Sequence, residues 1–148
     1  MSNNSSKGYN RAIEVSLKFC SYRERSEKEL EKKLIDKKFA DKTIKSSISK
    51  IIELGFVDNL RFSKFFARGK NKNNRWGKIK IRHELFRKGL SEREIEEGLN
   101  SIDSEIYKES IDKNIKLFKK KVKKFHKNKL IAHLTRKGFE MDIILSSI

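Results

Sequence analysis

Hydrophobic positions along this chain of 148 residues follow a five-position pattern that occurs three times. Successive apolar residues are four, five, five and four positions apart in every copy, and the copies start 51 and 49 residues apart. A pattern shared at nearly constant offset indicates tandem repetition, which is more typical of an extended binding scaffold than of an enzyme pocket. The three copies are Leu30, Leu34, Phe39, Ile44 and Ile48, then Ile81, Leu85, Leu90, Ile95 and Leu99, then Leu130, Leu134, Phe139, Ile144 and Ile148.

Each copy predicts a unit of three helices. The first two apolar positions share one face of a middle helix, and the last two share one face of a third helix. The central position falls in the turn between them, where it fills the gap. We therefore expect an all-α protein of three tandem, helix-turn-helix-like repeats that form an elongated, curved, solenoid-like rod. The predicted repeats are 10–57, 58–103 and 104–148, with first helices near 10–21, 59–71 and 104–124, after a flexible N-terminus at 1–9.

The predicted turns carry their own signals. Gly89 and Gly138 each follow a predicted middle helix and precede an apolar residue, which is typical of a left-handed helix stop. Lys38 occupies the corresponding position of the first copy, where a left-handed conformation costs on the order of 1 kcal/mol. The segments Ser26–Glu29 and Ser91–Glu94 read as capping boxes.

The composition supports a helical protein and indicates its cellular location. Charged residues make up 39% of the chain, proline is absent, and the net charge is +17. Cys20 is the only cysteine, so the chain has no internal disulfide, and neither an apolar signal region nor a membrane-spanning run is present. We expect a cytoplasmic monomer without a membrane segment.

Positive charge is concentrated in two segments. Residues 61–90 hold eleven Lys and Arg with one acid, and residues 113–137 hold eleven with none. Between them, residues 91–112 carry eight acids and two bases. A solvated helical surface explains any one lysine, whereas two such segments favour a nucleic-acid or nucleoprotein partner.

The stretch 65–78 is the best local candidate for that contact. It is basic, and we expect it to be a mobile connection between the first and second helices of the middle repeat. Trp76 within it has two interpretations: the ring stacks on a base or a partner, or it staples the entry to the next helix near Ile81. Basic residues at 22–25 and 125–128 occupy the equivalent corners of the other repeats.

Three motifs in order resemble one protein family. They are residues 25–34 (RSEKELEKKL), residues 54–62 (LGFVDNLRF), and residues 76–85 (WGKIKIRHEL) followed by Lys88-Gly89. Together they resemble the RecX family of bacterial RecA regulators over about residues 11–148. The resemblance implies three tandem three-helix repeats and binding to RecA filaments on single-stranded DNA. It also implies restraint of strand exchange, of ATP hydrolysis and of the co-protease activity that stimulates repressor cleavage.

The expected contacts with RecA or DNA are cations and one aromatic residue, and no cofactor is expected. Whether these residues meet RecA, single-stranded DNA or double-stranded DNA stays open at this point. The candidates are Arg23, Arg25, Arg68, Lys70, Lys72, Arg75, Trp76, Lys78, Lys80, Arg82, Lys116, Lys119, Lys120, Lys123, Lys124 and Lys127.

Two other classes of function fit the sequence less well. The alternative is a basic helical protein that acts on DNA without RecA, although the acidic third helices make poor groove readers. An enzyme is disfavoured, because His83, His126 and His133 lack partners at metal-ligand spacing and Cys20 reads as a core filler. We therefore assign no catalytic and no metal-binding residues.

Overall fold

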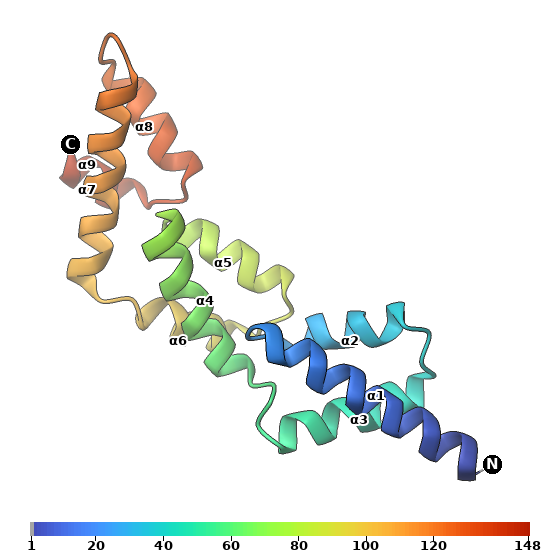
Figure 1. The fold of residues 1–148 in the computed structure, drawn as a ribbon. Helices are drawn as coiled ribbons and strands as arrows, with labels where there is room; N and C mark the ends of the chain where they lie inside the picture. Colours follow the sequence, from blue (N-terminus) through green and yellow to red (C-terminus); the bar gives the residue numbers. More distant parts are fainter. Residues whose placement is uncertain (1) are drawn as a thin grey trace. The chain divides into compact units, whose positions relative to one another are not determined.

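The computed structural model describes residues 2–148, and all regular structure in this part of the chain is α-helical (Figure 1). No helix among these residues has the length and apolar character needed to span a membrane. The helices are α1 (Ser2–Tyr22), α2 (Glu27–Asp36), α3 (Asp41–Glu53), α4 (Asn59–Asn74), α5 (Lys78–Arg87), α6 (Glu92–Asn100), α7 (Ser104–Lys121), α8 (Lys127–Arg136) and α9 (Met141–Ser147). In chain order they form three groups of three, as the repeat pattern predicts.

The described residues form two compact units. The N-terminal unit extends through Phe62 and includes Lys88–Leu90. In this unit α1 packs against both α2 and α3, and α2 packs against α3. Its core is closed by apolar residues from all three helices and the following turn, namely Ala12, Leu30, Leu34, Ile44, Ile51 and Val57.

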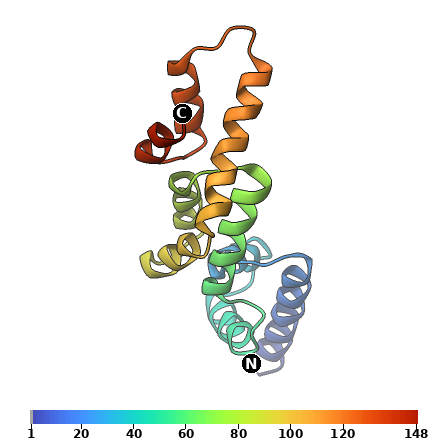
Figure 2. The ribbon, with the colours of Figure 1, turned by 90° about the vertical axis from the view of Figure 1, so that its left-hand side faces the viewer.

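The C-terminal unit comprises Ser63–Arg87 and Ser91–Ile148. Within it α5 packs on α6, and α7, α8 and α9 contact one another. Figure 2 shows α7, in orange, beside the C-terminal part of α4, in green. The two helices are joined there by Asn71, whose side-chain amide donates to the Trp76 carbonyl and to Ser110 Oγ. This contact fixes the end of α4 from which α5 departs.

The repeated apolar positions form the cores, as predicted. All of them are buried except Phe39 and Ile48, which pack partly buried against the N-terminal core, and Ile148, which is exposed. The central position of each copy lies in the turn after the middle helix, and Leu90 and Phe139 are buried there. One three-helix plan therefore accounts for the whole pattern.

Turns and caps also follow the sequence signals. Gly89 and Gly138 adopt φ values of 84° and 94°, and Lys38 adopts the same left-handed conformation at 68°. Both predicted capping boxes are present at Ser26 and Ser91. At the start of α4, the Asp58 carboxylate accepts the Arg61 N–H and so caps the helix.

The glycine turn after α8 docks on the start of α5. The Gly77 N–H donates to the Lys137 carbonyl at 2.7 Å, and the Ile79 N–H donates to the Gly138 carbonyl at 2.9 Å. These carbonyls satisfy N–H groups at the helix start that have no partner within the helix. A Cβ at Gly138 would lie 2.6 Å from the Lys80 backbone nitrogen, so the approach requires glycine as well as the positive φ. The turn that ends one middle helix thus caps the middle helix of the preceding repeat.

Three predictions of local structure were wrong. Residues 2–9 belong to α1 rather than to a flexible N-terminus, and Met1 lies outside the described residues. Residues 65–74 continue α4, so the connection to α5 contains only residues 75–77. Helix α7 ends at Lys121, and Val122 is already extended with ψ 141°, so the first helix of the third repeat does not reach 124.

Candidate nucleic-acid interface

Trp76 lies in the short connection between α4 and α5, where its half-buried ring brings two lysines together. The ring meets Phe66 edge-on, with centroids 6.5 Å apart and planes at 67°. Lys70 Nζ lies 4.9 Å from the Trp76 ring centroid and Lys80 Nζ lies 4.5 Å from it. Cation–π attraction at these distances holds both ammonium groups beside the indole. The ring packs on α4 through Phe66, and base stacking by Trp76 stays a prediction.

Arg75 precedes the tryptophan in a constrained conformation. Its φ is 55°, and its carbonyl accepts a hydrogen bond from Asn114 Nδ2 on α7 at 3.0 Å. The Arg75 Nε is buried and has no hydrogen-bond partner among the described residues. Lys137 Nζ, from the turn after α8, donates to the Asn74 carbonyl at 3.1 Å. The connection after α4 and the turn after α8 therefore place the cationic groups of Arg75 and Lys137 at the C-terminal end of α4.

These cations repel one another. Burial lowers the pKa of Lys137, and the charges of Arg75, Lys80 and Lys121 lower it further. Burial likewise lowers the pKa of His133, with added repulsion from Lys137, Arg136 and Lys121. A group that holds its proton less tightly because of neighbouring cations marks a site where an anion is stabilised. We call this set the cation cluster, and it consists of Lys70, Arg75, Lys80, Lys121, Arg136 and Lys137.

One acidic group of the C-terminal unit, Glu140, is already engaged. The Tyr107 hydroxyl donates to the Glu140 carboxylate and accepts the Lys78 backbone N–H at 2.8 Å. Burial, and then the hydrogen bond to Glu140, raise the pKa of Tyr107, so the phenol stays protonated and keeps its donor. This carboxylate therefore serves a buried hydrogen bond and forms no ion pair with the cation cluster.

Comparison with known proteins identifies the family. Residues 12–50 match the model of the first three-helix domain of RecX, and residues 58–99 match the model of the second. The chain is 31% identical over 140 residues to the regulatory protein RecX of Chlorobium phaeobacteroides, covering 93% of this chain and 91% of the relative. The chain belongs to the RecX family.

Other RecX relatives differ in length and agree in fold. The chain is 30% identical to the RecX protein of Bacillus subtilis over 146 residues but spans only 54% of that relative. The crystal structure of RecX from Lactobacillus salivarius matches with a TM-score of 0.82 and 26% identity, covering 99% of this chain and 96% of that one. A second RecX crystal structure, at 22% identity, shares the fold with a TM-score of 0.85.

Several predicted contact residues of the C-terminal unit are engaged inside the fold. Arg82 forms ion pairs with Glu92, at 2.7 Å, and with Glu96, so its charge is compensated. Lys78 Nζ lies 4.9 Å from the Tyr107 ring centroid, and Arg68 Nε donates to the Ser101 carbonyl at 3.3 Å. These side chains position helices in the C-terminal unit and are poorer candidates for phosphate contact than the cation cluster.

The two predicted arginines of the N-terminal unit are also engaged. Arg23 pairs with Glu29 at 2.8 Å. The Arg25 guanidinium lies 3.7 Å from the Phe19 ring centroid, and its Nε donates to the Phe19 carbonyl at 3.0 Å. Neither belongs to the cation cluster.

The remaining predicted lysines of the chain are exposed to solvent. Lys119 Nζ lies 5.1 Å from the Phe125 ring centroid, and none of the others forms an ion pair among the described residues. The prediction that Lys123 and Lys124 share a helix with Lys116, Lys119 and Lys120 is wrong, because α7 ends at Lys121. The exposed lysines are Lys72 on α4, Lys116, Lys119 and Lys120 on α7, Lys123 and Lys124 in the following loop, and Lys127 at the start of α8.

Sequence reasoning missed three members of the cation cluster. Lys121, Arg136 and Lys137 lie far along the chain from Arg75, and the docking of the α8 turn on α5 brings them together. The signal for this contact is the pair Gly77 and Gly138, since a Cβ at Gly77 would lie 2.3 Å from the Gly138 backbone. Two glycines in connections can indicate where two backbones touch.

Proposed function

We propose that this protein regulates the RecA recombinase. It binds RecA filaments on single-stranded DNA in the cytoplasm and restrains strand exchange, ATP hydrolysis and co-protease activity. Support for the RecA partner comes from membership of the RecX family over nearly the whole chain. The relatives are named as regulatory proteins, in accord with a role by binding rather than by catalysis.

The observation that best supports contact with the filament is the cation cluster of the C-terminal unit. Its side chains repel one another in the free protein, so a polyanionic partner relieves repulsion as it binds. Both nucleic acid phosphates and an acidic protein surface supply such charge. A regulator that touches more than one filament subunit stabilises the filament state in which all contacts form, and so restrains the changes of state that turnover needs.

The alternative function is direct DNA binding without RecA. The half-buried Trp76 ring between two lysines favours it, because aromatic and cationic groups together are typical of single-strand binding surfaces. The two functions differ in salt dependence. Binding to DNA alone weakens steeply as the salt concentration rises, because the counterions that the protein displaces gain less entropy in a more concentrated solution. Binding to a filament retains a salt-resistant part from protein contacts.

A binding titration tests the proposal. Labelled single-stranded DNA, bare or coated with cognate RecA, is titrated with the protein across a salt series. We expect tighter binding to the coated strand and a shallower salt slope. Equal affinities and equal slopes on the two substrates contradict RecA regulation and favour direct DNA binding.

A charge variant with a matched control tests whether the cation cluster is the binding surface. The variant Lys80→Gln, Lys121→Gln, Arg136→Gln removes three cluster charges without removing a side-chain hydrogen bond among the described residues. The control, Lys32→Gln, Lys42→Gln, Lys45→Gln, removes three exposed charges of the N-terminal unit. We expect the cluster variant to bind at least about tenfold more weakly than the control, since each charge contact contributes up to about 1 kcal/mol. Equal losses in both variants contradict the assignment.

A further inference from the structure

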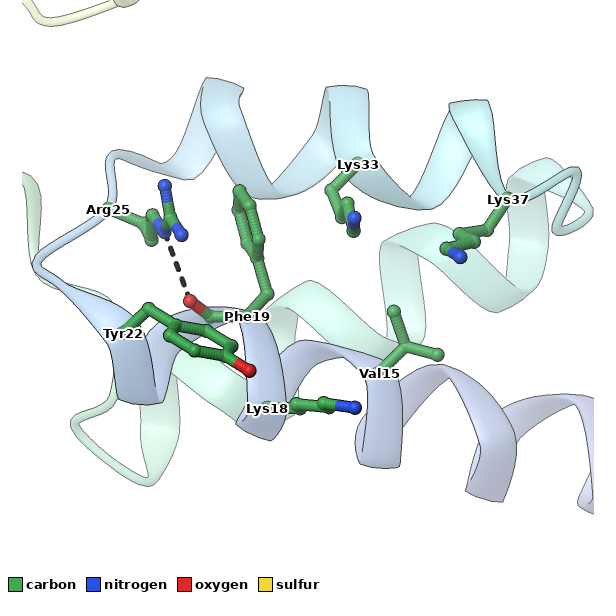
Figure 3. A pocket seen from close by; sticks show the side chains of 7 residues that line it. All are labelled: Val15, Lys18, Phe19, Tyr22, Arg25, Lys33 and Lys37. Carbon is green, nitrogen blue, oxygen red and sulfur yellow. Dashed lines mark hydrogen bonds between the residues drawn. The ribbon is translucent and has the colours of Figure 1, made fainter.

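A groove in the N-terminal unit has the chemistry of a peptide site that the proposed function does not use. It runs between α1 and α2, and its volume is about 390 Å³. Figure 3 shows its side chains, which come from both helices and from the connection between them. The lining residues are Val15, Lys18, Phe19, Tyr22, Arg25, Lys33 and Lys37, with no acid among them.

The apolar part of the groove is preformed. Val15 and Phe19 are half-buried and pack against the N-terminal core. Arg25 lies against the Phe19 ring at 3.7 Å and is tied to the Phe19 carbonyl. Tyr22, at one end, exposes 73% of its surface. The groove thus offers the apolar side chain of Val15 beside a Phe19 ring that Arg25 holds in place, together with the exposed aromatic side chain of Tyr22.

The rim is cationic and uncompensated. Lys18, Arg25, Lys33 and Lys37 form no ion pair among the described residues. Glu29, whose charge acts on Arg25, pairs with Arg23 and Lys88, and Glu24 pairs with Arg61. Four cations around an apolar floor create a field that favours a ligand carrying several negative charges.

We propose that this groove binds an acidic peptide segment in which a large apolar side chain lies between carboxylates. The apolar side chain enters above Val15 and Phe19, and the carboxylates meet Lys18, Lys33 and Lys37. A short docking motif gains specificity from apolar contact and charge complementarity together. The inference goes beyond the proposed function, because it concerns a different unit and a different ligand class.

A nucleic acid fits this groove less well. Bases bind single-strand proteins by stacking on open aromatic faces, and here Arg25 covers the Phe19 ring and Lys33 Nζ lies 5.4 Å from its centroid. The acidic helix of a second copy also fits less well. On α6, Glu92 and Glu96 pair with Arg82, and Glu94 completes the capping box at Ser91.

The test uses the full chain and a labelled synthetic peptide in which Glu and Asp alternate with Leu and Phe. Fluorescence anisotropy measures its affinity for the wild type, for Lys33→Glu with Lys37→Glu, and for a control, Lys42→Glu with Lys45→Glu. The control residues are exposed on α3 outside the groove and change the net charge equally. We expect the groove variant to bind about tenfold more weakly and the control to stay within about twofold, since reversed charges repel where the originals attracted.

Further variants and probes distinguish an acidic peptide from other ligands of the groove. Tyr22→Ala, at an exposed position that does not threaten the fold, is expected to weaken peptide binding several-fold, and a peptide with Ser in place of Leu and Phe to bind poorly. Equal losses in the groove and control variants overturn the proposal, because they show unspecific charge attraction. The proposal also fails if a labelled oligothymidylate, rather than the peptide, loses affinity in the groove variant. Concentration-dependent self-association that only the groove variant abolishes would identify a second copy as the occupant and overturn it too.

Discussion

Lys38→Gly is expected to stabilise the protein. Lys38 sits in the left-handed region at φ 68°, in the turn where the other repeats have Gly89 and Gly138. Its N–H donates to the Ile35 carbonyl, and the Phe39 N–H donates to the Leu34 carbonyl, so the backbone must keep this conformation to close the helix end. The side chain is exposed and loses nothing on removal.

The magnitude follows from two opposing effects. A non-glycine residue in the left-handed conformation costs about 1–2 kcal/mol, which the substitution removes. Glycine makes the unfolded chain more flexible, which costs about 0.4–1 kcal/mol. The net gain is about 0.5–1 kcal/mol, and for a chain of this length it raises the melting temperature by roughly 2 °C.

Thermal unfolding followed by circular dichroism at 222 nm measures this change, and urea unfolding checks it at constant temperature. The matched control is Lys37→Gly, because Lys37 has an ordinary φ of −83° and no strain to relieve. We expect Lys38→Gly to raise both midpoints and Lys37→Gly to lower them. A Lys38→Gly midpoint as low as that of Lys37→Gly would refute the reasoning, since it would show that the turn stores no strain.

Two further predictions concern the C-terminal unit. Gly138→Ala is expected to cost about 3 kcal/mol in urea unfolding, because its Cβ meets the Lys80 backbone. Gly55→Ala, with φ 80° and open space, is expected to cost only about 1 kcal/mol, and equal losses would contradict the docking of the α8 turn. The lowered pKa of His133 means that the unfolded chain binds its proton more readily than the folded protein. Stability is therefore lost as the pH falls through the ordinary value of 6.5. We expect His133→Gln to reduce this loss in melting curves recorded between pH 7.5 and pH 5. An unchanged pH profile in the variant would contradict this role of His133.

The repeat pattern and the turn signals were predictable because they depend on local chemistry. Burial of apolar residues at helical spacing does not depend on which partner helix covers them. Capping boxes and glycine stops likewise involve only a few neighbouring residues. This is why the capping box at Ser26 and the left-handed Lys38 follow from sequence alone.

The errors arise where tertiary contacts override local propensity. Residues 65–78, with two glycines and three asparagines, are predicted to be a mobile connection. The part up to Asn74 stays helical because Asn71 is buried and donates to the Trp76 carbonyl and to Ser110 on α7. The end of α7 at Lys121 is a different case with a local cause, because lysines four residues apart repel each other along one face of the helix. The cation cluster could not be predicted either, because its members meet only when the Gly138 turn docks on α5.

Hydrolysis of ATP by the cognate RecA on single-stranded DNA tests the central claim most directly. Substoichiometric wild-type protein is added to preformed filaments, beside the variant Lys80→Gln, Lys121→Gln, Arg136→Gln and its control, Lys32→Gln, Lys42→Gln, Lys45→Gln. We predict that the wild type and the control slow hydrolysis and that the cluster variant slows it far less. A rate that no addition of wild-type protein changes would contradict the account.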